Sequence, residues 1–185
     1  MPTIGVLFYF SKAPRYIPLP FIKAKLFAVV LFTIILPILL FFLLKTTRRV
    51  RSIHLDSTKE RITPLILNAV IVLLITQRIL PINELVELYF FFIGILLSTM
   101  ACLILAILKF KASIHMIASS GVLMFFIALS IHFSINIIGT IAIFFVIVGA
   151  LATSRLHMNA HSNIELIIGF FVGLVPQLIL LNYWL

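Results

Sequence analysis

The sequence has few charged residues, and very few of them are acidic. Only 10% of its 185 residues are charged, with five Asp or Glu against 14 Lys or Arg. A soluble domain carries about 25% charged residues and is about half apolar, whereas this chain is 63% hydrophobic and has a mean hydropathy of +1.29. The composition excludes a soluble protein and predicts an integral membrane protein.

Cysteine, repeats and linkers are also scarce. The single cysteine, Cys102, excludes an intramolecular disulfide. The sequence has no internal repeat, no low-complexity segment and no linker long enough to separate two domains. We therefore predict one transmembrane domain over residues 1–185.

Six predominantly apolar runs are long enough to cross a bilayer as helices. They are residues 26–44, 62–82, 88–108, 112–131, 133–154 and 164–185. Their apolar residues are continuous and do not alternate, which excludes the strands of a membrane barrel. We predict an all-α, six-helix membrane bundle, with the proline-containing residues 1–22 lying near the interface. In the last run, Gly169 and Gly173 form a small-xxx-small pair that favours close helix packing.

An even number of spans places the connections 45–61, 109–111 and 155–163 on one face of the membrane. Nine of the 14 basic residues lie there, namely Lys45, Arg48, Arg49, Arg51, Lys59, Arg61, Lys109, Lys111 and Arg155, together with the acidic Asp56 and Glu60. The positive-inside rule alone would make this face cytoplasmic. If Lys59, Arg61 and Arg155 instead bind an anionic substrate, six basic residues remain here against five on the other face.

Three polar segments border the spans on this face. Ser154, Arg155, His161 and Glu165 follow the pattern Ser-Arg, five residues, His, three residues, acid. Residues 112–115 read Ala-Ser-Ile-His at the start of the fourth run, and residues 59–64 read Lys-Glu-Arg-Ile-Thr-Pro at the start of the second. Ionisable residues this close to hydrocarbon are costly, and they usually have a function.

The residue types in these segments suit a phosphate ester. Arg61 and Arg155 can each bind phosphate oxygens through two parallel hydrogen bonds, and Ser113 adds a hydroxyl donor. The helix N-terminus beside Ser113 also favours an anion. Glu165 follows His161 by one helical turn, so its carboxylate can hydrogen-bond the imidazole. No His or Cys pair has metal-ligand spacing, and we expect neither a metal nor a cofactor.

Taken in chain order from residue 59 to residue 165, the three segments resemble the first, second and third signature motifs of the type 2 phosphatidic acid phosphatase superfamily. The third motif is matched by Ser154, Arg155 and His161, with Glu165 where the family usually has Asp. The second motif, Pro-Ser-Gly-His, is matched by Ser113 and His115. The first motif, a Lys and an Arg followed by Pro, is matched loosely by Lys59 and Arg61. The chain looks like a divergent bacterial membrane branch of this superfamily.

The resemblance implies a lipid phosphatase that hydrolyses a lipid phosphate or diphosphate through a metal-independent phosphohistidine mechanism. His161 would be the nucleophile, His115 the proton donor to the leaving group, and Glu165 the residue that orients His161. The residues implied in phosphate binding are Arg155, Arg61, Ser113, Lys59 and Ser154. The partner would be a phosphorylated membrane lipid and not a nucleic acid. The resemblance also implies a bacterial inner membrane, with the site facing the periplasm.

Two other functions compete with this interpretation. A degenerate member of the superfamily would bind anionic lipid, or assist a membrane complex, without turnover. A small transporter or flippase would need charge at mid-membrane depth on several spans, and the sequence has almost none away from the span ends. We interpret His54, His132 and His157 as interfacial residues, and Lys109 and Lys111 as anchors at the lipid headgroups.

Overall fold

The computed structural model describes residues 1–46 and 58–185, and the only regular secondary structure in these ranges is helical. The α-helices are α1 (Pro2–Lys12), α2 (Leu19–Val30), α3 (Leu36–Thr46), α4 (Thr58–Leu74), α5 (Val86–Ile107), α6 (Ile114–His132), α7 (Ile138–His157) and α8 (Asn163–Leu180). Two π-helical turns, η1 (Leu31–Ile35) and η2 (Ile75–Ile79), and a terminal 3₁₀ turn, η3 (Leu181–Tyr183), complete the order. The all-α prediction is confirmed.

Within residues 1–46 and 58–185, six helical stretches are long and apolar enough to cross a membrane, which makes this an integral membrane protein. They are Leu19–Thr46, Thr58–Ile79, Val86–Ile107, Ile114–His132, Ile138–His157 and Asn163–Tyr183. The last four begin and end within five residues of the predicted runs. The first begins seven residues earlier than predicted, and the second begins at Thr58 and not at residue 62.

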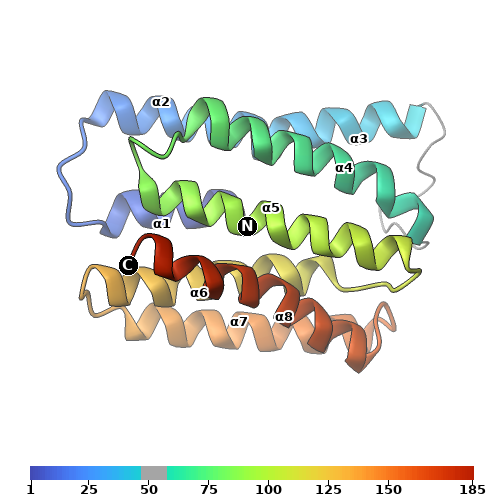
Figure 1. The fold of residues 1–185 in the computed structure, drawn as a ribbon. Coiled ribbons are helices and arrows are strands. Elements are labelled where there is room, and N and C mark those ends of the chain that lie inside the picture. The colour runs from blue at the N-terminus through green and yellow to red at the C-terminus, as the bar shows by residue number, and fades with distance from the viewer. Residues whose placement is uncertain (47–57) are drawn as a thin grey trace.

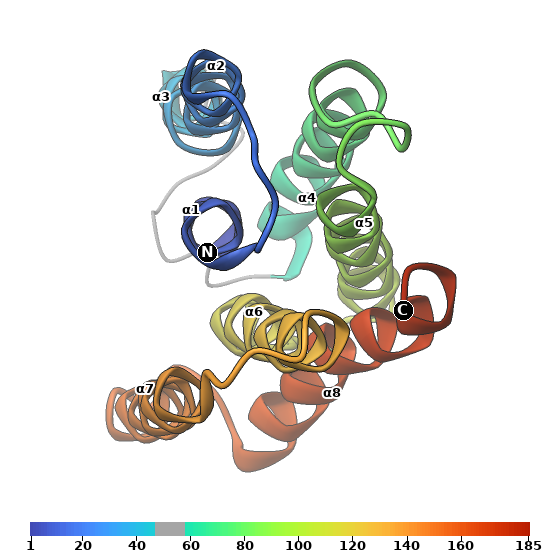
Figure 2. The same ribbon diagram turned by 90° about the vertical axis from the view of Figure 1, so that its left-hand side faces the viewer.

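The spans lie side by side with roughly parallel axes, and α6 occupies the centre (Figures 1 and 2). The apolar window of α6 is 67% buried, whereas that of α7 is 11% buried and that of α2 to α3 only 6%. In the end-on view, α7 lies beside α6 at the edge of the bundle. The central helix is therefore the one that begins beside Ser113 and His115.

The position of the N-terminal segment differs from the predicted one. Residues 2–12 do not lie at the interface but form α1 inside the bundle, where Val6 and Tyr9 are fully buried. Gly5 allows this close packing, because a Cβ atom there would lie 2.7 Å from the ring of Phe91. Figure 1 shows that the helix starts near the middle of the bundle's length. Residues 1–11 carry no charged side chain, which is the signal that the prediction missed.

The two π-helical turns lie next to prolines that cannot join an α-helical ladder. Pro37 follows η1 by two residues, and Pro81 follows η2 by two residues. Inside a helix, proline has no N–H group to donate and its ring clashes with the carbonyl four residues before it, so the wider turn η1 relieves this clash for Pro37, whereas Pro81 follows the end of its helix. Through η1, α2 and α3 continue as one stretch of 28 residues.

Helices α6 and α8 approach each other closely at the glycine pair. A Cβ atom on Gly173 would lie 2.1 Å from the carbonyl oxygen of Ile117, and one on Gly169 would lie 2.9 Å from that of Ser113. The predicted close packing at these glycines is confirmed. One turn before Gly169, the backbone N–H of Ser113 donates to the carbonyl of Glu165 at 3.2 Å. This packing joins Ser113 to Glu165, which lies 52 residues later in the sequence.

Candidate functional site

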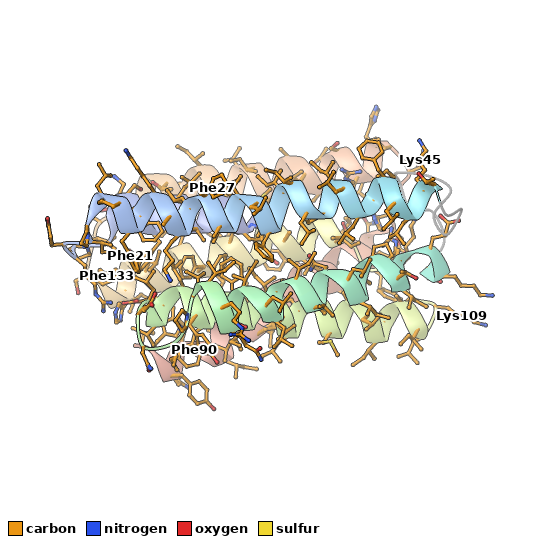
Figure 3. All side chains as sticks on the ribbon, turned by 90° about the horizontal axis from the view of Figure 1, so that it is seen from above. Phe21, Phe27, Lys45, Phe90, Lys109 and Phe133 are labelled. Carbon is orange, nitrogen blue, oxygen red and sulfur yellow. The ribbon has the colours of Figure 1, made fainter. Side chains whose placement is uncertain are left out.

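The starts of α4, α6 and α8 and the end of α7 lie at the same end of the bundle (Figure 1). Lys45 and Lys109 point outward at this end, whereas Phe21, Phe90 and Phe133 lie toward the other end (Figure 3). The three polar segments therefore share one end, as an even number of spans requires. Arg48, Arg49, Arg51, His54 and Asp56, which the sequence places on the same face, lie outside the described residues.

His161 and Glu165 form a hydrogen-bonded pair at the start of α8. The Nδ1 atom of His161 lies 2.9 Å from Oε2 of Glu165. A carboxylate only accepts hydrogen bonds, so Nδ1 carries the proton, and the lone pair of a neutral imidazole is on Nε2. The side chain of His161 is only 6% exposed. The pair thus presents a fixed imidazole whose second nitrogen is available to react.

The same carboxylate also caps α8. Its Oε2 accepts from the backbone N–H of Ser162 at 3.1 Å, and Ser162 Oγ accepts from the backbone N–H of Glu165 at 3.3 Å. This reciprocal capping box needs a side chain at the third helical position that reaches back to the cap. Asp is one methylene shorter than Glu. The capping box therefore gives a physical reason for Glu at position 165.

The environment of His161 favours its neutral form. Burial is the largest cause that lowers the pKa of His161, and the positive charges of Arg61 and Lys111 lower it further. The hydrogen bond and the negative charge of Glu165 act in the opposite direction, but the net pKa remains below its ordinary value. At neutral pH the imidazole is therefore uncharged, as nucleophilic attack requires.

His115 and Arg155 form a second pair, from the first turn of α6 and the last turn of α7. Nη2 of Arg155 lies 2.9 Å from Nε2 of His115. Because guanidinium only donates hydrogen bonds, this nitrogen of His115 is the acceptor and the ring is neutral in this arrangement. His115 lies within electrostatic reach of His161, Arg155 and Arg61, so the two pairs belong to one cluster.

Arg61 completes the cluster from the first turn of α4. The early start of α4 at Thr58 places Arg61 within the helix, where it is only 5% exposed. Its Nη1 donates to the carbonyl of Ala112 at 2.9 Å, next to Ser113. The charge of Arg61 acts on both His115 and His161. The most loosely matched of the three motifs thus places its arginine beside the other two.

Two buried polar atoms of the cluster have no hydrogen-bond partner among the residues that the structure describes. They are Oγ of Ser113, whose side chain is fully buried, and Nε of Arg155. Leaving a buried donor unpaired costs about 1–3 kcal/mol. Both atoms are donors that an anion could satisfy, which favours a negatively charged ligand here.

Two predicted binding residues lie away from this cluster. Ser154 is exposed on α7, and its hydroxyl lies 4.0 Å from the sulfur of Met158. Lys59 is exposed in the first turn of α4. The described contacts do not join either side chain to the two histidines.

Lys111 belongs to the cluster although the sequence suggested only a headgroup anchor. Its Nζ donates to the carbonyl of Ala160 at 3.3 Å, and its charge reaches His161. Its position two residues before Ser113 is the signal that could have identified it. Among the described residues, Lys111 and Arg155 lie in this cluster without a carboxylate contact, and such cationic donors suit an anion better than a metal ion.

Comparison with known proteins identifies no relative: no family model matches the chain, and neither a curated protein nor a solved structure matches it.

Proposed function

We propose that this protein is a membrane lipid phosphatase that hydrolyses a lipid phosphate or diphosphate through a phosphohistidine. The observation that carries the proposal is the pair of His161 and Glu165 beside Ser113 and Arg155, whose buried Oγ and Nε atoms have no hydrogen-bond partner among the described residues. The resemblance of the three motifs to the type 2 phosphatidic acid phosphatases supports the same chemistry. The substrate reaches the cluster from the surrounding bilayer.

In the first step, the lone pair of His161 Nε2 forms a bond to phosphorus. The bond between phosphorus and the ester oxygen breaks, and its electron pair stays on that oxygen, which takes a proton from His115. The Nδ1–H of His161 stays hydrogen-bonded to Glu165, whose negative charge stabilises the positively charged phosphoimidazole. Arg61 and Arg155 bind the other phosphate oxygens, whose charge is greatest in the transition state.

Arg155 has to move during this step, because it occupies Nε2 of His115 in the ligand-free arrangement. A bound phosphate ester draws the guanidinium toward its own oxygens, to which Arg can donate two parallel hydrogen bonds. Nε2 of His115 is then free to take a proton from the solvent, and this is the proton that it gives to the leaving oxygen. Arg155 thereby couples phosphate binding to the proton transfer.

In the second step, water attacks the phosphoimidazole. His115, now without its proton, takes one from the attacking water, while the bond between phosphorus and nitrogen breaks. The electron pair of that bond returns to Nε2 of His161, and inorganic phosphate leaves. The chain is ready for another substrate, and no cofactor takes part in the cycle.

For the location, we propose a bacterial inner membrane with the cluster facing the periplasm. The resemblance supports this orientation. The charge distribution supports it only if Arg61, Arg155 and Lys59 are counted as ligands of the substrate and not as topology signals.

The test is phosphate release from a panel of phosphatidic acid, phosphatidylglycerol phosphate and a polyprenyl diphosphate, in detergent with EDTA present. We expect the wild type to release phosphate and His161→Ala to lose at least about 10³-fold in kcat/KM. The matched control is His157→Ala, an exposed histidine in the same connection, which should retain activity. Rapid quenching should also trap an acid-labile phosphohistidine in the wild type.

A folded wild type that releases no phosphate from any of these lipids, yet binds phosphate or vanadate, would overturn the enzymatic proposal. That outcome would favour the degenerate member that binds anionic lipid without turnover. Equal activity of the wild type and His161→Ala would instead reject the phosphohistidine.

A further inference from the structure

A cavity of about 340 Å³ lies inside the bundle between α4, α5 and α6, with residues of α1, α3 and α8 completing its wall. Pockets for drug-sized ligands have volumes of about 300–1,000 Å³, so this one is near the lower limit. Most of its lining side chains are apolar. The space suits one hydrocarbon chain and is too small for two long ones.

The cavity begins at the cationic cluster. Arg61 donates to Ala112 beside the two histidines and also lines the cavity. Ile114, which lies between Ser113 and His115, lines it too. A ligand whose anionic group binds to Arg61 can therefore extend a chain from the cluster directly into the cavity.

The cavity also contains polar side chains deep in the bundle. Asn68 follows Arg61 by seven residues on α4, which is about 10 Å along the helix axis. Its Nδ2 donates to Oγ1 of Thr99 at 3.2 Å. From the other side of the cavity, Nε2 of Gln177 donates to the carbonyl of Phe91 at 2.9 Å.

Both amides keep hydrogen-bonding capacity for a ligand. Each contact uses one of the two N–H groups of the amide, which leaves a second N–H and the carbonyl oxygen. Polar groups at this depth are costly unless they are satisfied, and they commonly mark a binding site. A purely hydrocarbon chain would leave the remaining groups of Asn68 and Gln177 without a partner.

We propose that the cavity holds the chain of a single-chain lipid phosphate that bears a hydroxyl group about 10 Å from the phosphate, hydrogen-bonded by Asn68 and Gln177. The identity of the headgroup rests on the proposed function, whereas the chain is inferred from the cavity itself. Arg61 holds the phosphate end, the apolar wall covers the methylene groups, and the two amides select chains that carry the hydroxyl.

The test measures binding and not turnover. We would use dodecylphosphonate, whose carbon–phosphorus bond resists hydrolysis, and analogues with one hydroxyl at successive carbons, on the protein in lipid nanodiscs. We expect the best-placed hydroxyl to tighten binding by about twofold to tenfold, the range for one net hydrogen bond. Asn68→Leu should abolish that advantage and leave the affinity for plain dodecylphosphonate within about twofold, because partitioning into the disc is the same for both proteins.

A second variant tests whether the chain occupies the cavity at all. Ala118 lines it, so Ala118→Phe should fill the space and weaken dodecylphosphonate binding at least about tenfold, while the affinity for inorganic phosphate is unchanged. The matched control is Ala150→Phe, at an exposed position of α7, which should change neither affinity.

Unchanged dodecylphosphonate binding in Ala118→Phe would show that the chain lies elsewhere and would overturn the inference. Equal affinities for plain and hydroxylated chains in the wild type would remove the role of the amides. Either result could coexist with full phosphate release from other lipids, in which case the proposed function stands. If the wild type binds neither dodecylphosphonate nor inorganic phosphate, both proposals are overturned.

Discussion

Each end of the bundle carries a cluster of buried ionisable side chains, and the two clusters differ in how their charges are balanced. At the end opposite the candidate site, Glu87 is fully buried at the start of α5. Nη2 of Arg15 lies 2.7 Å and Nε2 of His132 3.3 Å from its Oε1, and the hydroxyl of Tyr9 donates to Oε2 at 3.1 Å. Two hydrogen bonds reach Oε2, from Tyr9 and Arg15, whereas Oε1 has the ion-pair contacts alone and no hydrogen-bond partner among the described residues.

The cluster at the other end is not balanced in this way. Among the described residues, Arg155 and Lys111 contact no carboxylate and donate instead to His115 and to the carbonyl of Ala160, and Ser113 Oγ has no partner. Removing one partner of a buried ion pair is strongly destabilising, because the other charge is left uncompensated. Surplus charge of one sign instead favours a ligand of the opposite sign. We therefore expect the Glu87 cluster to contribute to stability and, under the proposed function, the His161 cluster to bind an anion.

Of the substitutions that compare the two clusters, Arg155→Ala in the His161 cluster should have the largest effect on function, although it should not exceed the effect of His161→Ala. Arg155→Ala removes a donor to the phosphate oxygens, and we expect kcat/KM for lipid phosphate to fall by about 10²- to 10³-fold. The free energy of unfolding should not fall, because the variant loses one of three cations that repel one another. Phosphate release and denaturant unfolding, measured on the same preparation, check both expectations. A large loss of stability would mean that Arg155 is structural.

The corresponding change in the Glu87 cluster should have the opposite result. Arg15→Ala leaves the carboxylate of Glu87 buried without its closest cation, and we expect a loss of about 3 kcal/mol in unfolding free energy. The activity of the folded fraction should be unchanged. Lys12→Ala, an exposed cation in the same region, is the control and should cost little. Equal stability of the two variants would contradict a structural role for Arg15.

Two substitutions of Glu165 should separate its two contacts. Glu165→Gln can still cap α8, since Gln also forms a capping box, but it lacks the charge that stabilises a phosphorylated His161. We expect about a hundredfold loss of kcat/KM with little change in stability. Glu165→Asp keeps the charge and shortens the side chain, so it should lose about 1 kcal/mol of stability through the weakened cap. If both variants lose the same amount of kcat/KM and the same amount of stability, the two contacts of Glu165 do not have separate roles.

The smallest expected effect is on the pH dependence. Activity requires neutral His161, so kcat/KM should fall on the acid side as this residue is protonated, with a midpoint below the ordinary histidine pKa of about 6.5. Lys111→Gln removes a positive charge that lowers the pKa of His161. The midpoint should therefore move to higher pH, by less than about one unit. A shift to lower pH would mean that another group controls this part of the profile.

Part of the site could be predicted from the sequence because the relevant signal is local. The spacing of His161 and Glu165 is one helical turn, and the structure pairs them within one helix start. The arginines and Ser113 were identified by residue type beside an apolar run. Ser154 also matches a motif position, and Lys59 matches one loosely, yet both are exposed. Whether a matching residue faces the cluster depends on where its helix begins and on how the helix is rotated about its own axis. A sequence motif carries no information about either.

The sequence by itself determined that the chain is an all-helical membrane protein with polar segments at the span ends. These properties depend on composition and length, because a charged or unpaired polar group is costly in hydrocarbon wherever the segment lies. Only the tertiary structure decided that α1 packs inside the bundle and that Lys111 lies in the cluster of His115 and His161. It also decided that a cavity extends from Arg61 into the bundle. The spans are apolar on all sides, so no hydrophobic face indicates which helix packs against which. Close packing at Gly169 and Gly173 settles that question for α6 and α8, and it brings Ser113 to Glu165.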